Sequence, residues 1–104
     1  MNIYQGNTYK LPIKLSMSGK TIIADDVKKV EFAFGDVIKT YPEDATFEND
    51  TFFVPLTQED TFSLDPKGKA LQYQVRVLFQ NDSVKCTGQK PMSVMAAISK
   101  DVLK

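Results

Sequence analysis

The chain has 104 residues, of which 42% are hydrophobic and 25% are charged. This length and composition are typical of a single globular domain covering residues 1–104, and they exclude an extensively disordered chain. The 13 acidic residues balance the 13 basic ones, and only one basic residue is an arginine. Proteins that bind nucleic acids usually carry a basic excess that includes arginine, so we expect no nucleic-acid partner.

The cysteine content and the first residues bear on cellular location. The single cysteine, Cys86, cannot form an intramolecular disulfide, which favours a reducing compartment. The first residues lack the basic stretch and apolar run of a signal peptide. No segment approaches the roughly twenty apolar residues that span a bilayer. We therefore expect synthesis in the cytoplasm without secretion, and no membrane partner.

The N-terminal part of the chain is predicted to form short strands. Residues 8–17 alternate between apolar and polar side chains, which predicts a strand with one buried face. Pro12 cannot donate a hydrogen bond to a neighbouring strand, so this strand should be bulged or lie at the edge of a sheet. Ile22 and Ile23 predict a very short strand, and Asp25-Asp26 predicts a loop with room for one helical turn.

The middle of the chain predicts two β-hairpins. The first joins residues 30–35 to Val37–Tyr41 through Gly-Asp, and the second joins residues 45–48 to Thr51–Leu56 through Asn-Asp. Glycine, asparagine and aspartate tolerate the positive φ angles of tight hairpin turns. Both connections are therefore expected to be short turns between antiparallel strands.

Residues 57–61 are the one place where the sequence predicts the start of a helix. Thr57 can accept a hydrogen bond from the backbone N–H of Glu59 or Asp60, and acidic residues suit a helix N-terminus. The run before the next apolar residues is short, so we expect at most one helical turn. A β-turn at residues 65–68, with proline in its second position, should follow.

Leu71–Phe79 has the clearest pattern in the chain and is predicted to be the central strand. Its odd-numbered positions are all apolar or aromatic, whereas its even-numbered positions are polar until Leu78. One face should therefore lie in the core and the other near water. Residues 83–87 should form the next strand, with Cys86 buried and unreactive on its apolar side. Residues 92–98 should form the last strand, which carries no charge and therefore needs a partner.

These elements amount to about seven to nine short strands, with turn signals about every eight to twelve residues. Such a pattern is typical of a β-sandwich or barrel. We favour an all-β, immunoglobulin-like antiparallel sandwich. The chain has no tryptophan and one cysteine, so the core residues of true immunoglobulin domains are absent and the term describes architecture only.

We expect no enzymatic activity, no catalytic residues, no metal site and no cofactor. Histidine, the commonest general base and metal ligand, is absent, and one cysteine cannot make a structural zinc site. The paired carboxylates lie in loop-like sequence, where they are usually solvated, and they lack the Asp-x-Asp-x-Asp spacing of calcium loops. These pairs are Asp25-Asp26, Glu43-Asp44 and Glu59-Asp60.

Five residues are candidates for a protein interface. Arg76 lies on the polar face of the predicted central strand, between Gln74 and Leu78. Arginine is enriched where interfaces concentrate binding energy, although a cross-strand ion pair on a solvated face is the favoured interpretation of Arg76 alone. An apolar Leu78 on this polar face is a second anomaly. Tyr4 and Tyr41 fall outside the inward-facing sets and are candidates for exposed aromatic residues.

Two motifs resemble small β-sandwich proteins encoded among the structural genes of phages and prophages of Gram-positive bacteria. Leu-Thr-Gln-Glu-Asp-Thr-Phe at residues 56–62, followed by Tyr-Gln-Val-Arg-Val at residues 73–77, is also similar to the immunoglobulin-like N-terminal domain of phage baseplate upper proteins. Residues 6–11 and 26–32 fit the same resemblance, which covers most of the chain through short strand motifs.

The resemblance implies a structural or assembly protein of the virion, from the tail or baseplate region. Such a protein would be located in the virion and would contact copies of itself or neighbouring virion proteins, as a homo-oligomer or assembly subunit. Two other functions stay open. The chain could be a binding module for cell-surface glycans, with aromatic side chains that stack on sugars, or a small inhibitor or regulator of a host protein.

Overall fold

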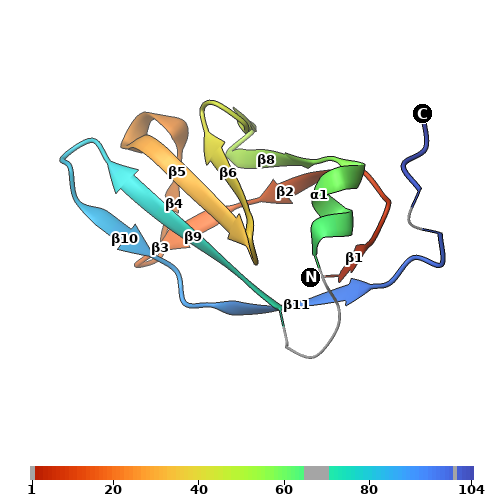
Figure 1. Cartoon of the computed structure of the whole chain (residues 1–104). Helices are drawn as coiled ribbons and strands as arrows, with labels where there is room; N and C mark the ends of the chain where they lie inside the picture. Colours follow the sequence, from red (N-terminus) through yellow and green to blue (C-terminus); the bar gives the residue numbers. More distant parts are fainter. Residues whose placement is uncertain (1, 65–70, 100) are drawn as a thin grey trace.

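The computed structural model describes residues 2–64, 71–99 and 101–104. These residues form eleven strands, one α-helix and one turn of 3-10 helix (Figure 1). The elements are β1 (Asn2–Tyr4), β2 (Tyr9–Ile13), β3 (Leu15–Met17), β4 (Lys20–Ile22), η1 (Ala24–Asp26), β5 (Val27–Phe34), β6 (Val37–Tyr41), β7 (Thr46–Glu48), β8 (Thr51–Leu56), α1 (Gln58–Ser63), β9 (Leu71–Phe79), β10 (Val84–Cys86) and β11 (Lys90–Met95). The β-turn predicted at residues 65–68 lies outside the described residues.

The larger sheet is organised around β9. β5 pairs with β9 along one side, whereas β10 and β11 pair with different halves of its other side. β6 continues the sheet beyond β5, and β1 continues it beyond β11. The prediction that Leu71–Phe79 is a central strand is therefore confirmed.

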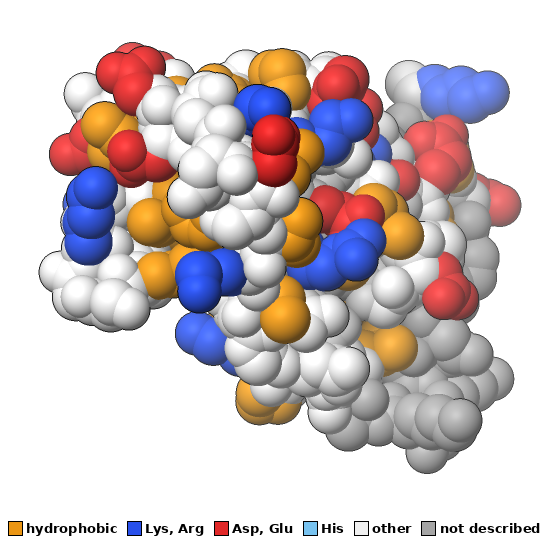
Figure 2. Space-filling model, turned by 90° about the vertical axis from the view of Figure 1, so that its left-hand side faces the viewer, with side chains coloured by type: hydrophobic (Ala, Val, Ile, Leu, Met, Phe, Trp, Pro, Cys, Tyr) orange, Lys and Arg blue, Asp and Glu red, His pale blue; other side chains and the backbone are white. Residues whose placement is uncertain are grey.

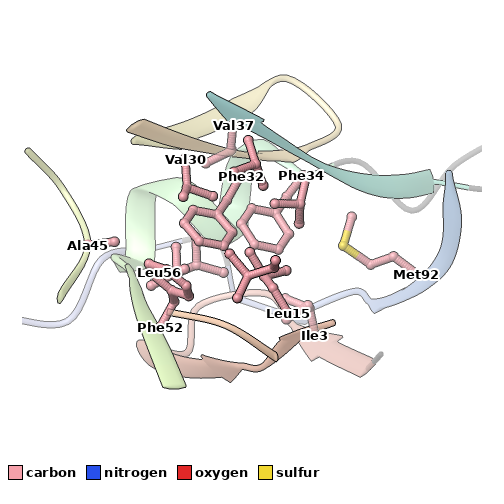
Figure 3. Packing of buried hydrophobic residues seen from close by; sticks show 14 of the residues in the cluster. Ile3, Leu15, Val30, Phe32, Phe34, Val37, Ala45, Phe52, Leu56 and Met92 are labelled. Carbon is pink, nitrogen blue, oxygen red and sulfur yellow. The ribbon is translucent and has the colours of Figure 1, made fainter. Parts of the chain in front are cut away.

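A second layer covers the inner face of this sheet. It consists of the three-stranded sheet β2-β8-β7 and the pair β3-β4. Figure 3 shows Phe32 and Phe34 of β5 pointing towards Phe52 of β8 and Leu15 of β3, and all four side chains are buried. The expected all-β, sandwich-like fold is confirmed. The immunoglobulin-like arrangement of its strands stays a prediction.

Both predicted hairpins are present, as β5–β6 and β7–β8. Asn49 and Asp50 have φ angles of 52° and 59° in the second turn, as a two-residue connection between twisted strands requires. The edge position predicted from Pro12 is also confirmed, because among the described residues β2 pairs with β8 alone.

The N-terminal part contains more strands than predicted. The single strand predicted over residues 8–17 is two strands, because at Lys14 the chain passes from its partner β8 to its partner β4. The apolar-polar alternation continues through this break, so the pattern does not reveal it. β1 was not predicted, because Ile3 is its one buried residue. The pairing of β1 with β11 is parallel, unlike the antiparallel expectation.

The last strand begins and ends earlier than the predicted range of 92–98. β11 pairs with β9 through its first half and with β1 through its second half. Beyond Met95 the chain leaves the sheet, and Ile98 is fully exposed. The uncharged end of this strand was expected to need a partner, and β1 is that partner.

The helix α1 begins where the sequence predicts it. Thr57 Oγ1 accepts a hydrogen bond from the backbone N–H of Asp60, and Asp60 Oδ2 accepts one from the N–H of Thr57, at 3.1 and 2.8 Å. Lys39 Nζ lies 2.8 Å from the same carboxylate oxygen. Neither helix in the described part of the chain has the length and apolar character needed to cross a membrane.

With six residues, α1 is longer than the single turn predicted. Thr61, in its middle, is fully buried, and its Oγ1 accepts a hydrogen bond from the N–H of Gly6 at 2.9 Å and donates one to the carbonyl of Asn7 at 3.0 Å. Gly6 has a φ of 87°, and a Cβ there would lie 3.1 Å from the ring of Phe62. The helix is therefore held by the loop after β1.

Replacing Phe52 by alanine should lower the free energy of unfolding by ~3–5 kcal/mol, because the substitution leaves a large cavity. The ring of Phe52 is fully buried, and its centroid lies 4.7 Å from that of Phe47, 5.1 Å from that of Tyr41 and 5.9 Å from that of Phe32. Unfolding in urea, followed by circular dichroism, measures the loss.

The neighbouring Phe53 supplies the matched control. Its ring is half-buried on the other face of β8 and lies under the ammonium of Lys10, 4.9 Å from the ring centroid. Phe53→Ala should therefore lower the free energy of unfolding clearly less than Phe52→Ala does. Equal losses would show that the two faces of β8 are assigned wrongly.

Asp60 should contribute a pH-dependent part of the stability. Burial raises the pKa of Asp60, but hydrogen bonds from Lys39 and Thr57 outweigh burial and hold the pKa below its ordinary value of 3.8. Stability gained from a lowered pKa is present above the unfolded-state pKa and is lost as the pH falls through the folded-state pKa. We expect the unmodified chain to lose stability as the pH falls below about 5.

Asp60→Asn should be less stable than the unmodified chain at pH 7 and should lose less stability on acidification. Thermal unfolding measured across this pH range tests both effects. Glu59→Gln is the control, because Glu59 is exposed and forms no ion pair among the described residues. A parallel pH dependence for Asp60→Asn and Glu59→Gln would contradict the role of Asp60.

Candidate interaction surface

The outer face of the larger sheet, on the side away from the core, carries most of the predicted interface residues. Side chains alternate along a strand, and directly paired residues point the same way. The buried residues Phe32, Val75 and Val77 therefore fix which neighbours face outward. The outer face consists of Lys29, Glu31 and Ala33 of β5, Ile38 and Thr40 of β6, Gln74, Arg76 and Leu78 of β9, and Val84 and Cys86 of β10.

Arg76 lies at the centre of the outer face and forms a bidentate ion pair with Glu31, directly opposite on β5. Nε of Arg76 lies 2.9 Å from Oε1 of Glu31, and Nη2 lies 3.0 Å from Oε2. The hydrogen bonds lower the pKa of Glu31 and raise that of Arg76. The cross-strand ion pair favoured from the sequence is thus present. It orients the guanidinium while 56% of the Arg76 side chain stays exposed.

Apolar side chains flank this ion pair on both sides. Leu78 is paired with Val84 of β10 and with Lys29 of β5, and all three line a shallow hollow of about 180 Å³ beside Arg76. Val84 is 60% exposed. On the other side, the exposed Ile38 is paired with Ala33. Arginine within an apolar surround is the composition enriched at the centre of protein interfaces.

The remaining three candidates take different positions. Gln74 lies on the outer face, and its Nε2 donates to the carbonyl of Thr87 at 2.9 Å. Tyr41 is not an exposed candidate, because it is paired with Val30, faces inward and packs edge-on against Phe52. Tyr4 is 54% exposed but lies on β1, at the opposite edge of the sheet from β6 (Figure 1).

The prediction that Cys86 is buried is wrong, because Cys86 is exposed. Val84 and Cys86 share a face, as expected, but it is the outer face, since they pair with Leu78 and Arg76. Lys85 pairs with the core residue Val77 and occupies the inner side. The alternation of Val84, Lys85 and Cys86 predicts the opposite orientation, and all three residues are exposed. Ile38 was missed because Val37–Tyr41 does not alternate.

The two edges of the larger sheet near this face differ. The backbone of Thr40 on β6 is occupied, because its N–H donates to Asp44 Oδ2 at 3.0 Å and its carbonyl accepts from the N–H of Asp44. On β10, Ser83 and Thr87 bond with β9. The intervening Val84 and Cys86 therefore direct their backbone groups away from the sheet. No described strand pairs with β10 on that side.

The acidic pairs considered for catalysis have local structural roles. In each pair one carboxylate oxygen accepts a hydrogen bond from a nearby backbone N–H, which satisfies a donor at the end of a turn or helix. The bonds join Ile23 to Asp26 at 3.1 Å, Thr40 to Asp44 at 3.0 Å and Thr57 to Asp60 at 2.8 Å. No group of three or more potential metal ligands occurs within the described residues.

Native-state labelling of Cys86 tests the corrected position. A thiol reagent such as a maleimide should modify the folded protein nearly as fast as the urea-unfolded protein, because the thiol is exposed on the outer face. Mass spectrometry after brief exposure measures the modified fraction. Labelling that requires unfolding would place Cys86 back in the core and would remove β10 from the outer face.

None of the comparisons with protein-family models, curated proteins and solved structures gave a match for this chain. The outer face and the sequence motifs are therefore the features of this chain that bear on its function.

Proposed function

We propose that this chain is a non-enzymatic structural or assembly protein of a phage or prophage virion, in the tail or baseplate region, and that it binds a neighbouring protein through the outer face. The observation that carries the proposal is the oriented Arg76 guanidinium, exposed between the apolar pairs Leu78–Val84 and Ala33–Ile38. The virion context rests on the sequence motifs at residues 56–62 and 73–77.

Three properties of the outer face support a protein partner. Its apolar side chains stand on rigid strands, so little conformational entropy is lost when they are covered. Arg76 is already oriented by Glu31 and has donors left for a partner carbonyl or carboxylate. The backbone groups of Val84 and Cys86 adjoin the same face, and an extended segment of a partner can pair with them.

A glycan-binding module is supported less well. Stacking on sugars needs exposed aromatic rings, and most aromatic side chains of this chain are buried or half-buried. Tyr4 is exposed, but it lies far from the outer face. A small inhibitor of a host protein would use the same kind of surface as a virion protein, and a binding assay against virion proteins separates these two functions.

Charge reversal at Arg76 should weaken association at least about tenfold, as expected for an arginine at the centre of an interface. The fold should persist, because the side chain is exposed. Binding to proteins encoded beside this chain, and to itself, can be followed by pull-down and by sedimentation velocity. Circular dichroism verifies that Arg76→Glu remains folded.

The swapped variant Glu31→Arg/Arg76→Glu is the matched control. It restores an ion pair between β5 and β9 with the charges exchanged, so a purely structural effect of Arg76→Glu should be rescued. If a partner contacts the guanidinium itself, the swap should restore stability but not binding. Unchanged binding in Arg76→Glu would remove the outer face from the proposed function.

A further inference from the structure

β10 is a short strand at a border of the larger sheet, and both of its ends are fixed to β9. Ser83, just before β10, has a carbonyl that accepts from the N–H of Phe79 at 2.9 Å. Thr87, just after β10, donates its N–H to the carbonyl of Val75 at 2.9 Å. The carbonyl of Thr87 in turn accepts from Gln74 Nε2 at 2.9 Å. The backbone groups that stay open therefore lie between these two residues.

Two residues of β10 direct their backbone N–H and carbonyl groups away from β9. Bonding residues alternate along an antiparallel strand, so Lys85 bonds with β9 while Val84 and Cys86 point outward. An extended segment placed beside β10 can satisfy the groups of both residues. β10 lies on the left of Figure 1, and Figure 2 shows this side of the molecule, where hydrophobic and lysine side chains are exposed together.

A second copy of β10 matches these backbone groups but not the side chain between them. All of the open groups are used in the antiparallel register that bonds Val84 of each copy with Cys86 of the other. This register has two-fold symmetry, and it places Lys85 directly opposite Lys85 of the second copy. Residues at such a position lie about 4.5 Å apart at Cα, and like charges there destabilise the pairing.

Shifted registers separate the two lysines but lose hydrogen bonds. A shift to either side would require Asp82 or Gly88 to bond with the second copy. Asp82 has a φ of 68° and lies in the preceding turn, and Gly88 lies beyond the end of β10. A shifted register therefore keeps only one of the two hydrogen-bonded pairs.

Lys85 is the single charged residue between positions 83 and 87, and it lies on the inner side of the sheet, opposite Val77. Among the described residues no carboxylate forms an ion pair with it. Asp25 and Asp26 line the same hollow of the surface, but Lys20 lines it too. An inward-directed lysine on a very short edge strand is a device by which proteins prevent pairing between edges.

We propose that Lys85 makes β10 selective: it keeps two copies of this chain from pairing at β10 and admits a partner strand with an acidic residue opposite it. A carboxylate at that position replaces the repulsion by a cross-strand ion pair. The partner residues on either side lie beside Val84 and Cys86 and extend the outer face. That the partner is another protein rests on the proposed function, whereas the exclusion of a second copy does not.

The variant Lys85→Glu supplies a strand with an acidic residue at the required position. Mixed with the unmodified chain, it should form a complex at least about tenfold tighter than the self-association of either chain, because a lysine then faces a glutamate. Sedimentation equilibrium at concentrations up to about 1 mM measures the association. Amide hydrogen exchange followed by NMR should slow at Val84 and Cys86 in the mixture alone, because their N–H groups become bonded.

Two variants are matched controls. Lys104→Glu makes the same charge change at an exposed residue on the opposite side of the molecule, at the chain end in Figure 1. Its mixture with the unmodified chain should stay monomeric. Val84→Pro, added to Lys85→Glu, removes an outward N–H without removing a hydrogen bond to β9, and it should abolish the complex.

A mixture of Lys85→Glu and the unmodified chain that stays monomeric would overturn the inference, as would a complex that persists with Val84→Pro. Either result leaves the proposed function standing if a virion protein binds in a manner sensitive to Arg76→Glu. Conversely, pairing in the mixture with no virion protein bound would retain the selectivity of β10 and reject the proposed function.

Discussion

The apolar side chains of β9 and β5 that pack against β8 are the contact on which the rest of the structure depends. Phe32 of β5 packs against Phe52 of β8 with 5.9 Å between the ring centroids, and Val75 and Val77 of β9 are buried in the same core (Figure 3). Because side chains alternate along a strand, this packing also decides what faces away from the core. The position of Arg76 on the opposite side is a direct consequence of the burial of its two neighbours.

The two layers differ in extent, and this difference leaves one end of the larger sheet uncovered. Six strands form one layer, whereas the other consists of a three-stranded sheet and a separate pair of strands. At the end where only β3 and β4 lie beneath the larger sheet, the inner side of β10 meets solvent, and Lys85 occupies a position that would otherwise be apolar. The larger sheet therefore has an outer face of mixed polarity and one end that the second layer does not cover.

Period-two alternation and turn residues were enough to predict the central strand, both hairpins and the helix start at Thr57. These two signals did not predict the strand boundaries and side-chain directions that depend on only one or two residues. The break at Lys14 keeps the alternation, and β1 has one buried residue. Cys86 was misplaced because its inward or outward direction depends on how far the second layer extends. The ion pair of Arg76 was foreseen, but its apolar surround comes from β6 and β10, which only the register brings together.

The hydrogen bonds between Asp44 and Thr40 have a directional consequence. They occupy the outward backbone groups of Thr40 on β6, while those of Val84 and Cys86 on β10 stay open. Of the two strands that border the outer face, β10 can therefore accept a foreign strand without losing existing hydrogen bonds, whereas β6 would first lose those of Thr40.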